Sequence, residues 1–435
     1  MYQTSMRAHA LIPLALALST PFPALAVPLS PNELPAPGVV TAPTPADEAY
    51  RRALQNLTDG NLDAAGRAFN ESLKLEPKSA KAMLGLAEIA FRNKKLDEAG
   101  KWIRRAVETD PGSSEAYASL GRYYALQGKN SEAEAALRKA SELDPRAVRP
   151  RVDLGDLLSF QRRLPDAIKF YQEAVAINPQ HAGAHYALGI ALARQGDNAK
   201  AQAELEHAAR LEANNPLPKL ALARVHASLK DPDKALVELN NALAIQPSLV
   251  DALLLKGDLL DAKGQTTEAT MAYQMAAKAA PKFALPHLKI AMMSDRNGQT
   301  DLAIASYKKV IELDPKQAVA YNNLAALALE RKQNLAQAEV WAKKAVELGP
   351  NVADYYDTLG WLQHARNNSR GALAALQKAT QLEPRDPAIQ YHLGVLYAET
   401  GDKIKAIEAL KRALNASNHF PSYAEAEKLM KTLQQ

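Results

Sequence analysis

The sequence contains no cysteine among its 435 residues. Disulfide bonds, zinc sites with cysteine ligands and thiol catalysis are therefore all excluded. A charge excess is also lacking, because 53 Lys and Arg residues stand against 48 Asp and Glu residues, with the two signs mixed along the chain. A net charge of +5 spread in this way is typical of a solvated surface, not of a nucleic-acid-binding patch.

The common motifs of nucleotide-binding and hydrolytic enzymes are missing as well. None of the patterns G-x-x-x-x-G-K-[ST], G-x-G-x-x-G and G-x-S-x-G occurs. His181 and His185 have the spacing H-x-x-x-H, which can place two imidazoles on one helical face for a metal. No glutamate follows as in H-E-x-x-H, and no third ligand is evident. We therefore predict that the protein is not an enzyme and has no cofactor or metal.

The first 26 residues differ in kind from the rest. Arg7 is their only Lys, Arg, Asp or Glu, an apolar run follows from Leu11 to Leu18, and Ala24, Leu25 and Ala26 supply small residues for cleavage. This pattern predicts a secretory signal peptide at 1–26 and a periplasmic or secreted protein. A membrane anchor is the alternative, but the run is short for a membrane-spanning helix. No cysteine is present to carry a lipid.

Residues 27–45 contain six prolines in nineteen residues. Such a stretch predicts an extended, solvated linker. The linker serves either as a spacer or as a docking strand for a proline-binding groove, and the sequence leaves both uses open. It also leaves open whether Met1 or Met6 starts the chain.

Beyond the linker, the chain repeats. Prolines recur 34 residues apart, with one step of 68 and one of 35, at positions 77, 111, 145, 179, 247, 281, 315, 350 and 384. A period of this length is the signature of a repeat architecture. Aligned on these prolines, eleven units fill residues 46–420.

Small residues recur at fixed places within the units. The twentieth residue is alanine in all eleven: Ala65, Ala99, Ala133, Ala167, Ala201, Ala235, Ala269, Ala303, Ala338, Ala372 and Ala406. Two antiparallel helices approach closely only where a side chain is no larger than a methyl group. The eighth residue is always glycine or alanine, and large residues alternate with these small ones. We expect large side chains of one helix to pack into spaces left by small residues of the other.

Each unit therefore reads as two helices joined by a turn. Apolar residues at i, i+3 and i+4 mark both helices. Glycines such as Gly128 and Gly196 suit a left-handed turn after the first helix, and the terminal proline stops the second. One unit cannot bury its apolar face alone, so stability comes from stacking. Residues 421–435 predict an amphipathic helix that caps the end of the stack.

This pattern closely resembles the tetratricopeptide repeat, most clearly in AYASLGRYYALQGKNSEAEAALRKASELDP at residues 116–145. The resemblance implies an all-α, right-handed superhelical solenoid of about eleven repeats with a C-terminal capping helix. Two departures occur, both at loops: Ala213 replaces a terminal proline, and the ninth unit has one extra residue, most simply in its turn ERKQNLAQ.

In that family, the second, fifth, ninth and twelfth residues of each first helix line a concave groove that holds a partner segment. The candidate groove residues are Lys81, Phe91, Arg122, Arg149, Tyr186, Asn322, Asp354, Asp357, Trp361, His364 and Tyr391. They mix apolar, aromatic and charged groups. This mixture favours a protein or peptide segment, or a glycan, over a polyanion.

The stretch YYDTLGW, residues 355–361, divides between packing and groove positions. Tyr356, Leu359 and Gly360 fall at repeat packing positions. Asp357 and Trp361 fall one helical turn apart at groove positions, and we expect them on the open face.

Two specialisations of the family do not fit. Recognition of a chaperone carboxyl terminus needs lysine at the fifth residue of a unit, and no unit has it. The asparagine ladder of O-linked N-acetylglucosamine transferases would lie at the sixth residue, where only Asn323 fits.

Residues 321–433 are also similar to the C-terminal module of exported bacterial repeat proteins, including those of exosortase-linked (PEP-CTERM-type) exopolysaccharide systems. We therefore predict a cell-envelope scaffold that binds a partner protein segment in its groove. The alternative is an accessory of exopolysaccharide synthesis or export that contacts glycan or the secretion machinery.

Overall fold

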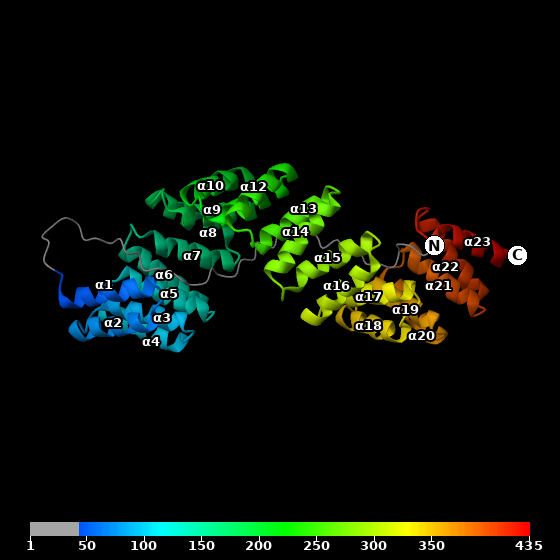
Figure 1. Cartoon of the computed structure of the whole chain (residues 1–435), viewed down its shortest axis with the longest axis horizontal. Coiled ribbons are helices and arrows are strands. Elements are labelled where there is room, and N and C mark those ends of the chain that lie inside the picture. The colour runs from blue at the N-terminus through cyan, green and yellow to red at the C-terminus, as the bar shows by residue number, and fades with distance from the viewer. Residues whose placement is uncertain (1–42) are drawn as a thin grey trace. The chain divides into compact units, whose positions relative to one another are not determined.

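The computed structural model describes residues 43–435, and the predicted signal peptide and most of the predicted linker lie outside the described residues. Within this range the structure has 23 helices and no strand. The helices form two compact units, residues 43–245 and 246–435, here called the N-terminal and C-terminal units. Figure 1 shows helices running back and forth in chain order within each unit.

The N-terminal unit contains six helix pairs. Its helices are α1 (Pro45–Thr58), α2 (Leu62–Leu75), α3 (Ala80–Arg92), α4 (Leu96–Thr109), α5 (Ser114–Leu126), α6 (Asn130–Leu143), α7 (Val148–Phe160), α8 (Leu164–Ile177), α9 (Ala182–Gln195), α10 (Asn198–Leu211), α11 (Pro216–Ser228) and α12 (Pro232–Ile245).

A capping box fixes the first residues of this unit. The Thr44 hydroxyl accepts a hydrogen bond from the Asp47 amide, and the Asp47 carboxylate accepts one from the Thr44 amide. Two backbone donors at the helix start are thereby satisfied.

The C-terminal unit contains five helix pairs and a final single helix. Its helices are α13 (Val250–Ala262), α14 (Thr266–Ala279), α15 (Ala284–Arg296), α16 (Thr300–Leu313), α17 (Ala318–Glu330), α18 (Leu335–Leu348), α19 (Ala353–Ala365), α20 (Ser369–Leu382), α21 (Pro387–Glu399), α22 (Lys403–Ala416) and α23 (Tyr423–Gln434). The last helix, α23, packs on α22 and buries Ala426 and Met430 with Phe420 in one cluster. The extra residue of the ninth repeat lies in the turn between α17 and α18, as predicted.

The helices of each pair pack along their length, and the second helix then packs on the first helix of the next pair in the same unit. All eleven alanines at the twentieth repeat position are 0% exposed. Opposite them, a Cβ on Gly189 would lie 2.6 Å from Leu205 Cγ and 3.2 Å from the Ala201 carbonyl oxygen. The close approach predicted from the small residues is therefore confirmed.

The turns within the pairs share one left-handed residue. Glycine occupies it in six repeats, including Gly128 and Gly196 as predicted. In the other five repeats the residue is Lys94, Arg162, Lys230, Lys332 or Asn367, with φ between 52° and 62°. The turn geometry is therefore imposed by helix packing even where a side chain makes it unfavourable.

Replacing Ala201 by leucine is expected to lower the free energy of unfolding by about 1–3 kcal/mol, because the added atoms have no space between α9 and α10. Chemical denaturation followed by circular dichroism measures the change. Ala203→Leu on the exposed side of α10 is the matched control, expected to lie close to the wild type. Equal effects of the two substitutions would contradict the close packing at Ala201.

Candidate functional site

Consecutive first helices lie against one another from α1 to α11 in the N-terminal unit and from α17 to α21 in the C-terminal unit. The contacts join α5 to α7, α7 to α9, α17 to α19 and α19 to α21, among others. These rows of first helices form what we call the first-helix face of each unit. A side chain at a predicted groove position therefore lies beside the next first helix as well as its own.

In the N-terminal unit, the predicted groove residues remain accessible. Lys81 is exposed, and the side chains of Phe91, Arg122, Arg149 and Tyr186 are partly buried. These five residues come from α3, α5, α7 and α9, so they follow one row of helices. The structure thus keeps these five residues accessible on consecutive first helices, and their use as one binding groove stays a prediction.

Two of these residues share one carboxylate. Arg122 on α5 lies 3.1 Å from one oxygen of Asp153 on α7, and Arg149 lies 3.0 Å from the other. Arg122 also donates to the Ser119 hydroxyl at 3.0 Å. Because two arginines meet one aspartate, this cluster carries one net positive charge.

A second ion pair lies on the neighbouring helix α3. Arg92 donates to Glu88 at 2.8 Å and to the Leu57 carbonyl oxygen at 3.1 Å. Burial raises the pKa of the Glu88 carboxyl, although Arg92, Arg122 and Arg149 all act to lower it. Desolvation therefore outweighs the nearby positive charge here.

Asp156 is a partly buried acid that the repeat pattern alone does not distinguish from other groove positions. It is the ninth residue of its repeat, and its carboxylate accepts a 2.6 Å hydrogen bond from the Tyr171 hydroxyl on α8. Burial raises its pKa to about 7, and the charge on Asp153 acts in the same direction. Asp156 stands at a ninth repeat position, so the repeat pattern could have pointed to it. Its burial and its hydrogen bond, however, depend on residues of other helices.

In the C-terminal unit, four predicted groove residues are buried instead of open. Asn322 is 0% exposed, Asp357 4%, Tyr391 7% and Trp361 9%. The prediction that they lie on an open face is therefore wrong. The reason is the contact between successive helices, because α19 packs against α17, α21 against α19 and α23 against α21, on sides that the repeat pattern leaves free.

The Trp361 ring is held between two histidines. Its centroid lies 4.7 Å from that of His364 and 4.4 Å from that of His392, and both pairs are stacked. His392, on α21, also lies 2.8 and 3.0 Å from the two oxygens of Asp357. Trp361 and Asp357 are thus packing residues of the contact between α19 and α21.

The repeat pattern does not connect His392 with Asp357, because His392 belongs to the next repeat. It follows Asp357 by 35 residues, one repeat and one residue. The same offset joins His364 to Glu399 at 2.5 Å, and Arg194 to Ser159 at 3.1 Å. A search for polar pairs at this offset would have revealed the contacts.

Asp354 and His364 stay partly exposed, as predicted. Burial raises the pKa of Asp354 to about 6, and the charges of Asp357, Glu383 and Asp386 act in the same direction. Tyr356, Leu359 and Gly360 lie in the packing, as expected of their repeat positions. The stretch YYDTLGW is therefore almost entirely structural.

His181 and His185 have other partners than a metal. The His181 ring accepts a hydrogen bond from the Ala184 amide at the start of α9. His185 lies 2.6 Å from Glu204 and 3.0 Å from the Pro179 carbonyl oxygen. In residues 43–435, no group of three His, Asp or Glu side chains is placed to hold a metal ion.

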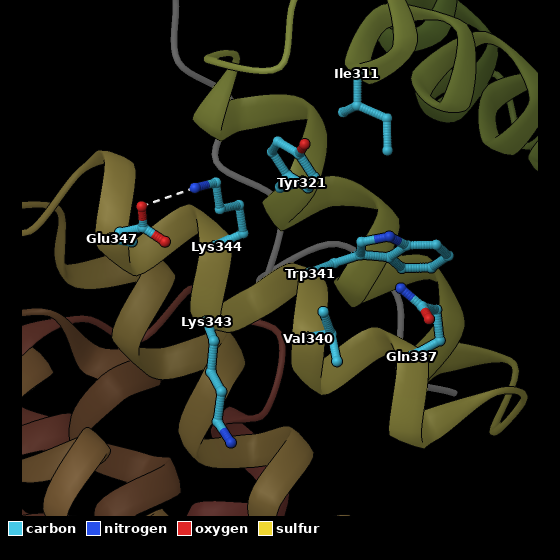
Figure 2. Close-up of a pocket in the computed structure, with 8 residues that line it drawn as sticks. All are labelled: Ile311, Tyr321, Gln337, Val340, Trp341, Lys343, Lys344 and Glu347. Atoms are coloured by element: carbon cyan, nitrogen blue, oxygen red, sulfur yellow. Dashed lines mark hydrogen bonds and ion pairs between the residues drawn. The ribbon is translucent and has the colours of Figure 1, made fainter.

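A shallow depression between α16, α17 and α18 was not predicted. Figure 2 shows its lining, with the Trp341 ring beside Gln337 on one side and the ion pair of Lys344 and Glu347, 2.7 Å apart, on the other. Ile311, Tyr321, Val340 and Lys343 complete it. The depression opens widely to solvent, and 57% of Val340 is exposed.

No helix in the part of the chain described by the structure is both long and apolar enough to cross a membrane.

Four family models match the chain, and all describe tetratricopeptide repeats. They cover residues 48–114 and 358–420 (tetratricopeptide repeat), 114–146 (tetratricopeptide repeat), 161–196 and 296–330 (TPR repeat) and 182–293 (tetratricopeptide repeat-like domain). The models describe the repeat and do not distinguish an exopolysaccharide class. No curated protein matches the sequence.

Several solved structures are similar in fold. The APC/C hetero-tetramer Cut9-Hcn1 is 13% identical over 90% of this chain and 97% of that chain, with a TM-score of 0.44. PilF of Pseudomonas aeruginosa is 22% identical over 50% and 98%, with a TM-score of 0.43. YrrB, described as a TPR protein with an unusual peptide-binding site, is 23% identical over 43% and 96%, with a TM-score of 0.35. These likenesses are too distant to say anything about function.

Proposed function

Because the chain belongs to the tetratricopeptide-repeat family, we propose that it is a non-enzymatic scaffold holding a segment of a partner protein. The observation that carries the proposal is the first-helix face of the N-terminal unit. Lys81, Phe91, Arg149 and Tyr186 stay accessible there along one row of helices.

The chemistry of this face suits a peptide. The aromatic side chains of Phe91 and Tyr186 share this row of helices with ion pairs that are only partly buried. Phe160 at the end of α7 is 66% exposed. Apolar surface supplies affinity, and a few fixed polar groups supply orientation. A face of this kind suits an extended chain with both apolar and charged residues.

The proposed location is the cell envelope, outside the cytoplasm. Support comes from the apolar run Leu11–Leu18 and the small residues Ala24 to Ala26, which fit a cleaved export signal. These residues lie outside the described part of the chain. Removal of residues 1–26 from the mature protein, read by N-terminal sequencing, is the expected result of export.

A second candidate is an accessory role in exopolysaccharide synthesis or export, supported by the similarity of residues 321–433 to such proteins. Trp361 is covered by His364 and His392 and cannot stack on a sugar. Tyr321 and Trp341, both partly buried in the depression of Figure 2, are the aromatic residues this role would use. Sugar rings stack on such side chains.

Site-specific photocrosslinking in cells tests the scaffold proposal. A photoreactive amino acid at position 122 or 186 is expected to capture a protein, identified by mass spectrometry. Lys101 and Lys169, exposed on the second helices α4 and α8, provide the control positions. Capture at the control positions but not on the first-helix face would place the binding surface elsewhere. Capture of polysaccharide from position 341 would favour the second candidate.

A further inference from the structure

The fourth and seventh repeats contain the same partly buried arrangement. Asp156 on α7 and Asp258 on α13, each the ninth residue of its repeat, accept a hydrogen bond from Tyr171 and Tyr273 at 2.6 and 2.7 Å. The glycine before each aspartate makes room for the tyrosine, because a Cβ there would lie 2.4 Å from the tyrosine ring in both repeats. The chain thus builds one carboxylate site twice.

The two sites differ in their third member. Lys289, the sixth residue of the following repeat, lies 2.8 Å from Asp258 and neutralises it. The sixth residue that follows the Asp156 repeat is Ala187, which has no charge. In the described chain, Asp156 has no ion pair with a Lys, Arg or His residue, and Arg149, whose charge acts to lower its pKa, is bonded to Asp153.

In a third repeat, the sixth residue of the following repeat reaches the same place. Tyr307 stands at the same repeat position as Tyr171 and Tyr273. The sixth residue of the repeat after it, Asn323, donates to its hydroxyl at 2.8 Å. Of the three repeats with a tyrosine at this position, the Asp156 repeat alone is followed by a residue without a polar side chain.

The surroundings of Asp156 suit the stem of a long basic side chain. Asp156 is not fully covered, and Val152, one turn before it on α7, and Tyr186, Ala187 and Ile190 on α9 are also partly exposed. All four pack against the hydrophobic cluster that contains Tyr171, the hydrogen-bond partner of Asp156. Helix α9 therefore carries apolar side chains where the helix after the other site carries Lys289. Lysine and arginine lay their carbon stems along such surface while the charged end finds a partner.

We propose that Asp156 binds a lysine or arginine side chain of the captured partner segment, in the place that Lys289 occupies beside Asp258. The inference rests on the proposed function, because the same first-helix face must hold the segment. The raised pKa of Asp156 agrees with it, because burial without a cationic neighbour disfavours the charged carboxylate.

Two variants and one pair of peptide pools test the proposal. One pool of fluorescent nonapeptides has lysine fixed at the centre, and the matched pool has norleucine, which keeps the carbon stem and lacks the charge. We expect the wild-type protein to bind the lysine pool about tenfold more tightly, measured by fluorescence anisotropy. Asp156→Asn keeps an acceptor for Tyr171 and loses the charge, so the preference is expected to disappear.

Ala187→Lys supplies the missing lysine from within the chain. It is expected to abolish the preference and to lower the pKa of Asp156, read from its carboxyl resonance by NMR. Asp258→Asn is the matched control and leaves the preference unchanged, because Lys289 already fills that site. Circular dichroism checks that each variant folds. An unchanged preference in both Asp156→Asn and Ala187→Lys would overturn the proposal, as would its loss in Asp258→Asn.

The pool experiment separates this inference from the scaffold proposal. Protein capture at position 186 without any preference for lysine would keep the scaffold and overturn the basic side chain as its ligand. A preference that depends on Asp156, without protein capture at 122 or 186, would support the site and overturn the scaffold.

Discussion

Replacing Trp361 by alanine is expected to lower the free energy of unfolding by about 3–5 kcal/mol. The indole is 9% exposed and lies between the rings of His364 and His392. Its removal leaves a cavity where α19 meets α21. The buried pair of Asp357 and His392 then loses the ring that packs against it. The loss therefore combines apolar area, ring stacking and the cavity.

Denaturation of the whole chain measures this loss, and hydrogen exchange of α19 to α22 locates it. Repeat proteins unfold through neighbouring repeats, so we expect the protection of these helices to fall most. Trp341→Ala is the control, because the Trp341 ring lines an open depression and its loss is expected to cost less. A Trp361 variant as stable as the wild type would mean that the ring is a surface residue after all.

Replacing Asp156 by asparagine is expected to raise the free energy of unfolding at pH 8 by about 2–4 kcal/mol. The pKa of the carboxyl is raised from 3.8 to about 7 in the folded protein. Between these values the folded state binds a proton that the unfolded chain has released, so wild-type stability falls as the pH rises through this window. The full difference between the two pKa values corresponds to about 4 kcal/mol of stability. The partial exposure of Asp156 reduces this contribution toward about 2 kcal/mol.

Urea denaturation of wild type and variant at pH 4 and pH 8 gives the measurement. Other carboxyl groups titrate in both proteins, so the difference between the two isolates Asp156. It is expected to be near zero at pH 4, where the wild-type carboxyl is protonated. Asp258→Asn removes an acid paired with Lys289, so this variant is not expected to be stabilised at pH 8. An equal difference in the free energy of unfolding at the two pH values would contradict a raised pKa of Asp156.

The sequence predicts the repeat scaffold well because its determinants are local and periodic. Ala201 and the ten alanines at equivalent positions recur every 34 or 35 residues, and each one marks a place where two helices touch. The glycine at the turn is almost as informative. Five turns have no glycine at this position, and there Lys94 and four other residues adopt the same left-handed conformation.

The candidate site was harder to predict because its members belong to different repeats. The exposure of Trp361 depends on His392 in the following repeat, and the pKa of Asp156 depends on its burial and on Tyr171 of the neighbouring helix. A repeat pattern treats each unit alone, so it assigns Asp357 and Trp361 to an open face that the next helix covers. The accessibility of Arg149 and Tyr186 was predictable, because both side chains stay partly exposed at positions that the repeat pattern leaves open.

Ion pairs across repeat boundaries have a further consequence for the evolution of such a chain. Asp258 with Lys289 and Asp357 with His392 are each divided between two consecutive repeats. Loss, duplication or exchange of a whole repeat would keep the spacing of the alanines and hence the stack. It would change which residues pair across the boundaries on both sides of the altered repeat. Binding properties can therefore diverge through rearrangement of whole repeats while the solenoid fold is kept.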